Sequence, residues 1–311
     1  MTFNDQPATP VVKTIGLVVH PSRSVLDSVR VITTSAARHR ATVIARTADA
    51  VRVGSDITLV DAEEFVDRAD AIVSLGGDGT MLGAMRLVVD RPVPVLGVNH
   101  GNLGFLVEIA PAQLETALAR IVEGAYTLEP HGCLDVHVDT APACWTAFND
   151  VVITAAAPST TMSVDLLANT VRHGYYRADA LIACTPIGST AYNYAAGGPI
   201  VSPASPSMVL TPVAPMSGMS RSVVLGADDA ISLANPSADQ PLRVSVDGTP
   251  TGRLDPRRTM SIRLHADAVS LIRLDPDTHL QRNAVKLSLL NLPLREDQLR
   301  ELFPEPPDPL G

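Results

Sequence analysis

A glycine-rich segment between two apolar runs constrains the fold of this chain more than any other feature. The segment Gly76-Gly-Asp-Gly-Thr80 follows a strand-like run at 71–75 and precedes a helix-like run at 81–89. Such a connection is typical of the carboxyl edge of a parallel sheet. Glycines permit positive φ and let a phosphate approach the backbone, and the start of the following helix favours anions. The segment therefore predicts a site for a phosphorylated ligand.

The same segment supplies the candidate catalytic group. Asp78 can accept a proton from an attacking hydroxyl or hold Mg²⁺, and the alternative is an Asp-Gly turn that only caps the helix. The candidate phosphate-binding residues are Gly76, Gly77, Gly79 and Thr80. The chain has two lysines, Lys13 and Lys286, and neither lies in a glycine-rich segment. This excludes a Walker A loop and the strand lysine of protein kinases.

Charge and cysteine content bound the partners and the compartment. The formal charge is 24 − 33 = −9, so we expect neither nucleic acid nor an anionic membrane as a partner. Cys133, Cys144 and Cys184 have no metal-ligand spacing and are odd in number, so we expect small buried hydrophobic side chains in a reducing cytoplasm. No apolar run approaches the length of about 18 residues that a membrane-spanning helix needs. No motif for a metal held directly by the protein is present.

The order of predicted elements divides the chain near Gly124. Before it, strands alternate with helices, which predicts a Rossmann-like α/β domain with a mostly parallel sheet. We expect strands at 13–20, 41–45, 57–60, 71–75 and 93–98, and helices at 24–37, 62–68, 81–89 and 114–122. After it, strand-length runs separated by turn residues predict a β-rich domain of stacked antiparallel sheets. These runs lie at 133–138, 145–148, 151–155, 163–168, 180–184, 223–225, 231–233, 242–246, 260–264 and 269–274, and a helix is expected at 279–290.

Further polar motifs lie at the ends of the predicted strands. The turn Thr185-Pro-Ile-Gly-Ser-Thr-Ala-Tyr192 combines hydroxyls with a ring that can stack on a base. Asn149-Asp150 offers a donor and an acceptor to a purine edge, although an ordinary turn is the alternative. Asp247-Gly248 is first a hairpin turn and second a substrate contact. Phe105, in a glycine loop at 99–106, packs either on a base or in the core. The esterase motif Gly-x-Ser-x-Gly is absent from the sequence.

Together these motifs resemble those of NAD kinases. They occur in the order found in that family, over about residues 13–285. The Gly-Gly-Asp-Gly motif is shared with diacylglycerol kinases, sphingosine kinases and phosphofructokinases, whereas the turn at 185–192 is much more specific. Besides the segments quoted above, the resemblance rests on Tyr176-Arg-Ala-Asp179, Gly197-Gly-Pro199 and Val246-Asp-Gly248.

The resemblance implies a reaction and residue roles. The expected reaction transfers the γ-phosphoryl group of ATP, or a phosphoryl group of polyphosphate, to the 2′-hydroxyl of the adenosine ribose of NAD, with Mg²⁺ or another divalent cation. Asp78 would be the catalytic carboxylate and Asp247 would border the nicotinamide. Arg177 and Asp179 would reach the ligand from the same subunit or from a neighbouring subunit of a homodimer or homotetramer. The full set implied to bind NAD is Gly79, Phe105, Asn149, Asp150, Arg177, Asp179, Thr190, Ala191, Tyr192 and Asp247.

The resemblance also implies a discontinuous architecture. The α/β domain would comprise 13–124 plus 276–303, the β-rich domain 125–275, and flexible tails 1–12 and 304–311, with the C-terminal helix packed back on the first domain. The chain departs from the family pattern at Ile187, Ala180, Asp150 and Asn102. The departures at Ile187 and Ala180 keep open the alternative of a non-catalytic NAD(P) sensor. The shared Gly-Gly-Asp-Gly motif keeps open a lipid kinase, although the turn at 185–192 argues against it.

Overall fold

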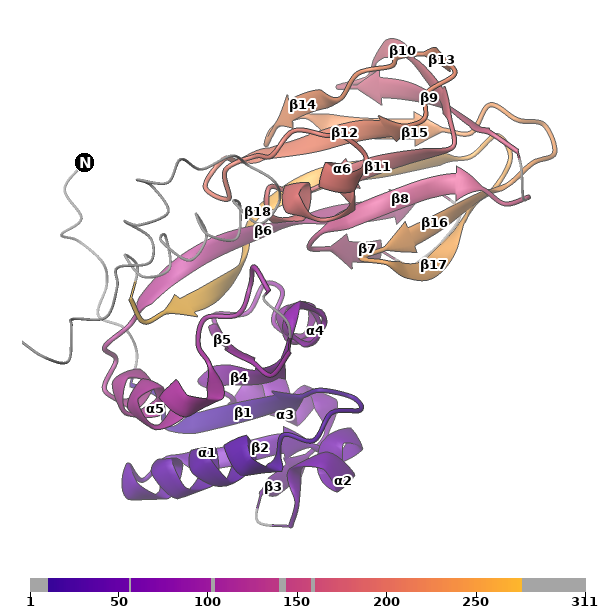
Figure 1. Cartoon of the computed structure of the whole chain (residues 1–311). Coiled ribbons are helices and arrows are strands. Elements are labelled where there is room, and N and C mark those ends of the chain that lie inside the picture. Colours follow the sequence, from indigo (N-terminus) through magenta and orange to yellow (C-terminus); the bar gives the residue numbers. More distant parts are fainter. Residues whose placement is uncertain (1–10, 56, 102–103, 140–143, 158–159, 276–311) are drawn as a thin grey trace, which may run out of the picture. The chain divides into compact units, whose positions relative to one another are not determined.

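The structure is a computed structural model that describes residues 11–55, 57–101, 104–139, 144–157 and 160–275 (Figure 1). The chain forms two compact units, one made of Met1–Glu129 with Ser270–Gly311 and one of Pro130–Val269. The helix expected at 279–290 and most of both expected tails lie outside the described residues. Among those described, no helix combines the length and the hydropathy that crossing a membrane requires.

The first unit contains a parallel sheet in the order β3-β2-β1-β4-β5, and the end of β18 extends it beside β5. All its pairings are parallel, so the predicted Rossmann-like sheet is confirmed. The strands are β1 (Thr14–Val19), β2 (Thr42–Arg46), β3 (Thr58–Val60), β4 (Ala71–Gly76), β5 (Val95–Asn99) and β18 (Thr259–Arg273). The helical elements are α1 (Leu26–Arg38), η1 (Thr47–Asp49), α2 (Ala50–Val53), α3 (Ala62–Arg68), α4 (Asp78–Leu87), η2 (Pro111–Gln113) and α5 (Leu114–Val122).

Side-chain alternation along the strands assigns the helices to the two faces of this sheet. Leu17 belongs to the same buried cluster as Ile32 of α1 and Leu118 of α5. On the opposite face, a Cβ on Gly16 would lie 2.8 Å from the Phe65 ring of α3, which requires a residue without a side chain there. Because successive residues of a strand point to opposite faces, α1 and α5 cover one face and α3 the other.

Two predicted helix starts are wrong. Helix α1 begins at Leu26, two residues after the predicted start, and its N-cap Val25 makes no side-chain hydrogen bond. Helix α4 begins at Asp78, three residues before the predicted start, and its N-cap is Gly77. The apolar periodicity begins only at Met81 and therefore missed the polar first turn. Asp78 thus lies in the first turn of the helix, where a negative charge is favoured by the helix dipole.

The second unit contains two stacked sheets, as predicted. One sheet has the order β13-β10-β9-β15-β18, with β6 beside β18 and β7 beside β6, and the other has the order β14-β12-β11-β8-β16-β17. Buried residues of both sheets form one core, for example Val164 and Met260 from the first and Leu181 and Val244 from the second. The further elements are β6 (Thr127–Val138), β7 (Cys144–Ala147), β8 (Asp150–Ala155), β9 (Met162–Ala168), β10 (Val171–Ala178), β11 (Ala180–Cys184), η3 (Ile187–Thr190), α6 (Tyr192–Ala195), β12 (Ser207–Val213), β13 (Ser217–Gly218), β14 (Val223–Gly226), β15 (Ala230–Ala234), β16 (Leu242–Val246) and β17 (Thr249–Leu254).

Sequence periodicity missed some strands and split another. Strand β10 (Val171–Ala178) carries exposed polar residues such as Arg172 and His173, and its apolar pattern is correspondingly weak. The runs at 260–264 and 269–274 were predicted as separate strands but form the single strand β18. Asp267 adopts φ +57° within it, a local irregularity that interrupts the apolar alternation without ending the strand.

Candidate functional site

Asp78 lies at the carboxyl edge of the parallel sheet, immediately after β4. Its Oδ2 accepts a hydrogen bond from the backbone N–H of Phe105 at 2.8 Å, and its Oδ1 accepts one from Leu106 at 3.1 Å. Phe105 follows the next strand of the sheet, β5. The two N–H groups fix the orientation of the carboxylate, and each oxygen retains a lone pair for a further partner. The Asp78 carboxylate thus binds the loop after β5, whereas the N-cap of α4 is Gly77.

The glycines around Asp78 have two different physical roles. A Cβ on Gly76 would lie 2.1 Å from the Thr80 hydroxyl, and a Cβ on Gly104 would lie 2.3 Å from Asp78 Oδ1, so both positions require close approach. At Gly77 and Gly79 an added Cβ would meet no atom within 4 Å. None of the glycines in the 76–79 motif has a positive φ. The motif therefore does not use the positive φ that glycine permits, because helix α4 begins inside it.

Asp247 connects two predicted motifs of the second unit. Its φ is +44° and that of Gly248 is +76°, so the pair forms the hairpin turn between β16 and β17. The Asp247 carboxylate also accepts hydrogen bonds from the backbone N–H groups of Phe148 at 3.1 Å, Asn149 at 2.7 Å and Asp150 at 3.0 Å. Its main contact in this structure is therefore the Asn149-Asp150 backbone.

The turn after β11 packs on that same Asn149-Asp150 segment. The Thr185 hydroxyl donates to the Phe148 carbonyl oxygen and accepts a 3.0 Å hydrogen bond from Gly188 N–H. A Cβ on Gly188 would lie 1.9 Å from the Asn149 carbonyl oxygen, so only glycine fits. The structure thus packs the start of the turn that carries Thr190, Ala191 and Tyr192 on the Asn149-Asp150 segment, which Asp247 also contacts.

Asn193 organises this turn and was not predicted. Its side-chain N–H groups donate to the carbonyl oxygens of Ser189 and Pro199, both at 3.0 Å, and its Oδ1 accepts a 2.6 Å hydrogen bond from the Thr211 hydroxyl. Asn193 is fully buried, and a Cβ on Gly198 would lie 2.0 Å from its Oδ1. Its position beside Tyr192 is the only sequence signal for it, since its partners are distant in the chain.

The predicted binding side chains differ in exposure. The Tyr192 ring is 45% exposed and is available for stacking. The Thr190 hydroxyl donates to the Ile187 carbonyl oxygen at 3.1 Å, so it stabilises the turn. Asp150 is buried, and burial together with the neighbouring Asp247 carboxylate raises the pKa of Asp150 to about 6. A ligand that contacts the Asp150 side chain therefore contacts a carboxyl group with a pKa of about 6.

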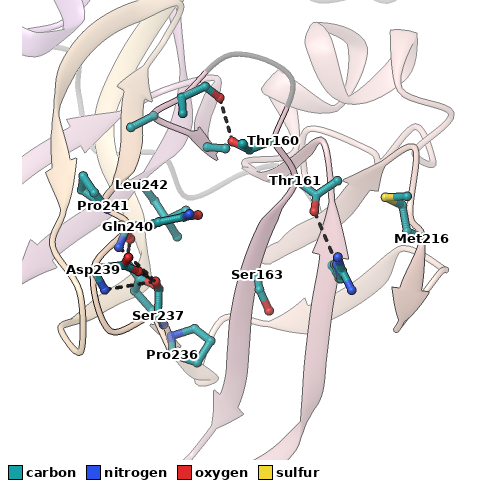
Figure 2. Close-up of a pocket in the computed structure, with 15 residues that line it drawn as sticks. Thr160, Thr161, Ser163, Met216, Pro236, Ser237, Asp239, Gln240, Pro241 and Leu242 are labelled. Carbon is teal, nitrogen blue, oxygen red and sulfur yellow. Dashed lines mark hydrogen bonds between the residues drawn. The ribbon is translucent and has the colours of Figure 1, made fainter.

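Arg177 and Asp179 lie away from these residues. Asp179 precedes β11 and Thr185 follows it, so they are about 20 Å apart at roughly 3.3 Å per residue. Arg177 instead lines a pocket of about 770 Å³, where its Nε donates to the Thr161 hydroxyl at 3.4 Å (Figure 2). Figure 2 also shows the polar groups of Ser237 and Asp239 in this pocket. Within one subunit, Arg177 and Asp179 therefore lie apart from the turn at 185–192.

The structure shows how far the three cysteines are buried, and it brings together a group of potential metal-ligating side chains. None of the three cysteines, all within the described ranges, forms a disulfide, and Cys133 and Cys184 are buried as expected, but Cys144 is exposed, so the expectation of burial is wrong for it. Cys133, Asp135 and His265 place their ligand atoms within 4.8 Å of one another. Sequence spacing could not reveal this group because His265 comes from β18 and the other two from β6.

Comparison with known proteins gives consistent matches. The family model described as ATP-NAD kinase N-terminal domain matches residues 15–126, and that described as ATP-NAD kinase C-terminal domain matches 148–274. A relative named NAD kinase from Caldanaerobacter subterraneus is 36% identical over 227 residues, which cover 72% of this chain and 80% of the relative. Another, from Gemmatimonas aurantiaca, is 37% identical over 222 residues, which cover 70% and 77%.

Solved structures with similar folds include two kinases. Yeast NADH kinase complexed with NADH has a TM-score of 0.81 at 21% identity, covering 93% of this chain and 91% of that one. An NAD kinase from Archaeoglobus fulgidus in complex with ATP has a TM-score of 0.68 at 23% identity, covering 88% and 98%. At these identities the two likenesses establish the fold alone.

Proposed function

The chain belongs to the NAD kinase family, and from this premise we propose that it phosphorylates the 2′-hydroxyl of the adenosine ribose of NAD to give NADP. The phosphoryl group comes from the γ position of ATP or from polyphosphate. The observation that carries the proposal within the chain is the fixed Asp78 carboxylate at the edge of the parallel sheet. Phosphoryl transfer depends mainly on positioning and charge neutralisation.

Asp78 is the group that we assign to the reacting hydroxyl. A carboxylate held by two backbone N–H groups has a defined direction in space, so it can orient a hydroxyl and accept its proton. The exposed Gly79 and the open space at Gly77 support phosphate approach at the start of α4. A divalent cation such as Mg²⁺ is held by one or two carboxylates together with substrate phosphates. The free lone pairs of Asp78 fit that role, and the ion would supply charge neutralisation.

The second unit supplies the proposed NAD-binding residues. Asn149 and Asp150 meet the adenine end, and Tyr192 stacks on the adenosine beside Thr190 and Ala191. The hydrogen bonds from residues 148–150 to Asp247 support this assignment, because they hold the Asn149-Asp150 backbone in one conformation. Asp247 acts mainly as a positioning residue in this arrangement, and Phe105 remains a proposed contact from the first unit.

Arg177 and Asp179 are proposed to act across a subunit boundary in a homodimer or homotetramer. Their separation from the turn at 185–192 supports this, since one subunit would not bring this pair and the turn to the same adenosine. Light scattering coupled to size-exclusion chromatography tests the oligomeric state, and a monomer would contradict it. The odd number of cysteines, which is awkward for a disulfide framework, supports the cytoplasm as the compartment.

A coupled NADP-formation assay tests the function. Purified protein is incubated with NAD, Mg²⁺ and a panel of donors that includes ATP, other nucleoside triphosphates and polyphosphate. NADP formation that stops in the Asp78→Asn variant is the expected result. Tight NAD binding by calorimetry without turnover would instead identify a sensor, and phosphorylation of a lipid rather than NAD would identify a lipid kinase.

A further inference from the structure

Three basic side chains gather at the carboxyl edge of the parallel sheet, beside the Asp78 segment. His20 follows β1 and His100 follows β5, on the two strands that flank β4. The His100 N–H donates to the Gly76 carbonyl oxygen at 2.8 Å, which joins the His100 loop to the glycine motif. Arg23 completes the group because its guanidinium donates to the His100 carbonyl oxygen. A Cβ on Gly101 would lie 3.0 Å from this guanidinium.

The local backbone holds these groups in place. His20 Nδ1 accepts hydrogen bonds from the N–H groups of Ser22 at 3.2 Å and Arg23 at 2.9 Å. An accepting Nδ1 leaves the ring proton on Nε2, so His20 presents a donor at its outer nitrogen. The same two hydrogen bonds hold the backbone at Ser22 and Arg23 in place. The His20 ring and the backbone of Arg23 are therefore held together by hydrogen bonds within the protein.

No acidic side chain balances this cluster among the residues that the structure describes. The contact of Arg23 with a backbone carbonyl leaves most of its N–H donors unused, and no carboxylate lies within ion-pair distance of it in the described ranges. His100 Nε2 is buried without a hydrogen-bond partner in the same described part. Burial and, after it, the Arg23 charge lower the pKa of His100. A buried imidazole nitrogen without a hydrogen-bond partner is costly, and a bound anion that accepts from Nε2 would offset that cost.

We propose that His20, Arg23 and His100 form the binding site for the polyphosphate group of the phosphoryl donor. The proposal rests on the proposed kinase function, and it assigns binding of the phosphoryl donor to residues outside the glycine motif. Arginine offers a planar fork that matches two phosphate oxygens, and the two imidazoles add single donors on either side of the Asp78 strand. ATP and inorganic polyphosphate share this chemistry. The pyrophosphate of NAD is the competing occupant.

Calorimetry on the intact protein without NAD tests the proposal directly. Inorganic tripolyphosphate and MgATP are titrated separately into the wild type, Arg23→Ala and the matched control Arg30→Ala. Arg30 is an exposed residue of the following helix, and its 3.4 Å pair with Asp27 is also exposed. Loss of a charge-assisted hydrogen bond predicts that Arg23→Ala weakens binding of the phosphates about tenfold to hundredfold. Arg30→Ala should retain wild-type affinity.

Kinetics separate the possible outcomes. The expected result is a raised KM for the donor in Arg23→Ala, with the KM for NAD changed by less than about twofold. If only MgATP binds, the donor is a nucleoside triphosphate, and if tripolyphosphate also binds, polyphosphate is a second source. Unchanged affinity for both phosphates, or a loss confined to NAD, would overturn the proposal. A wild type that binds tripolyphosphate but forms no NADP would refute the kinase function while supporting the phosphate site.

Discussion

The carboxylate of Asp78 accepts a 2.8 Å hydrogen bond from the backbone N–H of Phe105. This bond links the first turn of α4 to the loop after β5, so the orientation of the proposed catalytic group depends on a neighbouring loop. Gly104 permits the contact, because any side chain there would collide with Asp78.

Asp78→Asn is expected to lower kcat by more than about 100-fold, the scale of one acid–base group. An amide retains the size of the side chain but cannot accept a proton at neutral pH. Its NH₂ group would also face one of the two backbone donors, so a drop in thermal stability is expected as well. Steady-state kinetics with circular dichroism check both effects, and a near-normal rate would contradict the catalytic assignment.

Gly104→Ala tests the same carboxylate without changing it. The new Cβ would stand 2.3 Å from Asp78 Oδ1 and must displace either the loop or the carboxylate. We expect kcat to fall at least about tenfold, since small misplacements of reacting groups are costly. Gly77→Ala is the matched control for stability, because its Cβ meets no atom within 4 Å. Equal folding stability and equal kcat of Gly104→Ala and the wild type would refute the positioning role.

Asp150→Asn should change how stability depends on pH. The folded-state pKa of about 6 lies above the ordinary 3.8, so the folded protein binds this proton more tightly than the unfolded chain. The stabilisation is complete below pH 3.8 and is lost as the pH rises through 6, by about 3 kcal/mol at most. The midpoint temperature of thermal unfolding should therefore be higher for the asparagine variant than for the wild type at pH 8, but not at pH 4.

Exposed Asp228 provides the control for that comparison. Asp228→Asn removes the same charge from the same unit without removing a buried carboxyl. If the midpoint temperatures of Asp150→Asn and Asp228→Asn change in parallel between pH 4 and pH 8, Asp150 is not the source of the pH-dependent stability.

Tyr192→Ala should weaken NAD binding while leaving the fold intact. The ring is 45% exposed, so its removal costs little packing, whereas loss of one base–aromatic stack is expected to raise the KM for NAD about tenfold. The control is Tyr175→Ala, another tyrosine of this unit, whose ring is 42% exposed. An equal change of KM in both variants would argue against stacking on Tyr192.

Asp247→Ala should affect both stability and NAD affinity. It would leave the N–H groups of residues 148–150 without their carboxylate acceptor, which costs about 1–3 kcal/mol when such groups are buried. We expect a lower midpoint in urea and a higher KM for NAD. Normal NAD affinity in a destabilised variant would limit Asp247 to a folding role.

Local patterns in the sequence determined much of the fold. Alternating strands and helices predicted the parallel sheet, and both 62–68 and 114–122 were predicted with the observed helix limits. The glycine motif identified Asp78 because a strand, a turn and a helix follow each other within a few residues there. Polar β10 and the start of α4 were missed, since apolar periodicity carries no signal where side chains are exposed or where a helix begins with glycines.

Only the tertiary structure decided which distant residues meet. Asp247 holds the backbone of Phe148 through Asp150, Asn193 binds Thr211, and Arg23 contacts the His100 loop, each across a long sequence separation. The sequence lists these residues but contains no local pattern that pairs them. Hydrogen bonds and close approaches of this kind depend on strand order and register, which set the positions of side chains only after the whole sheet has formed.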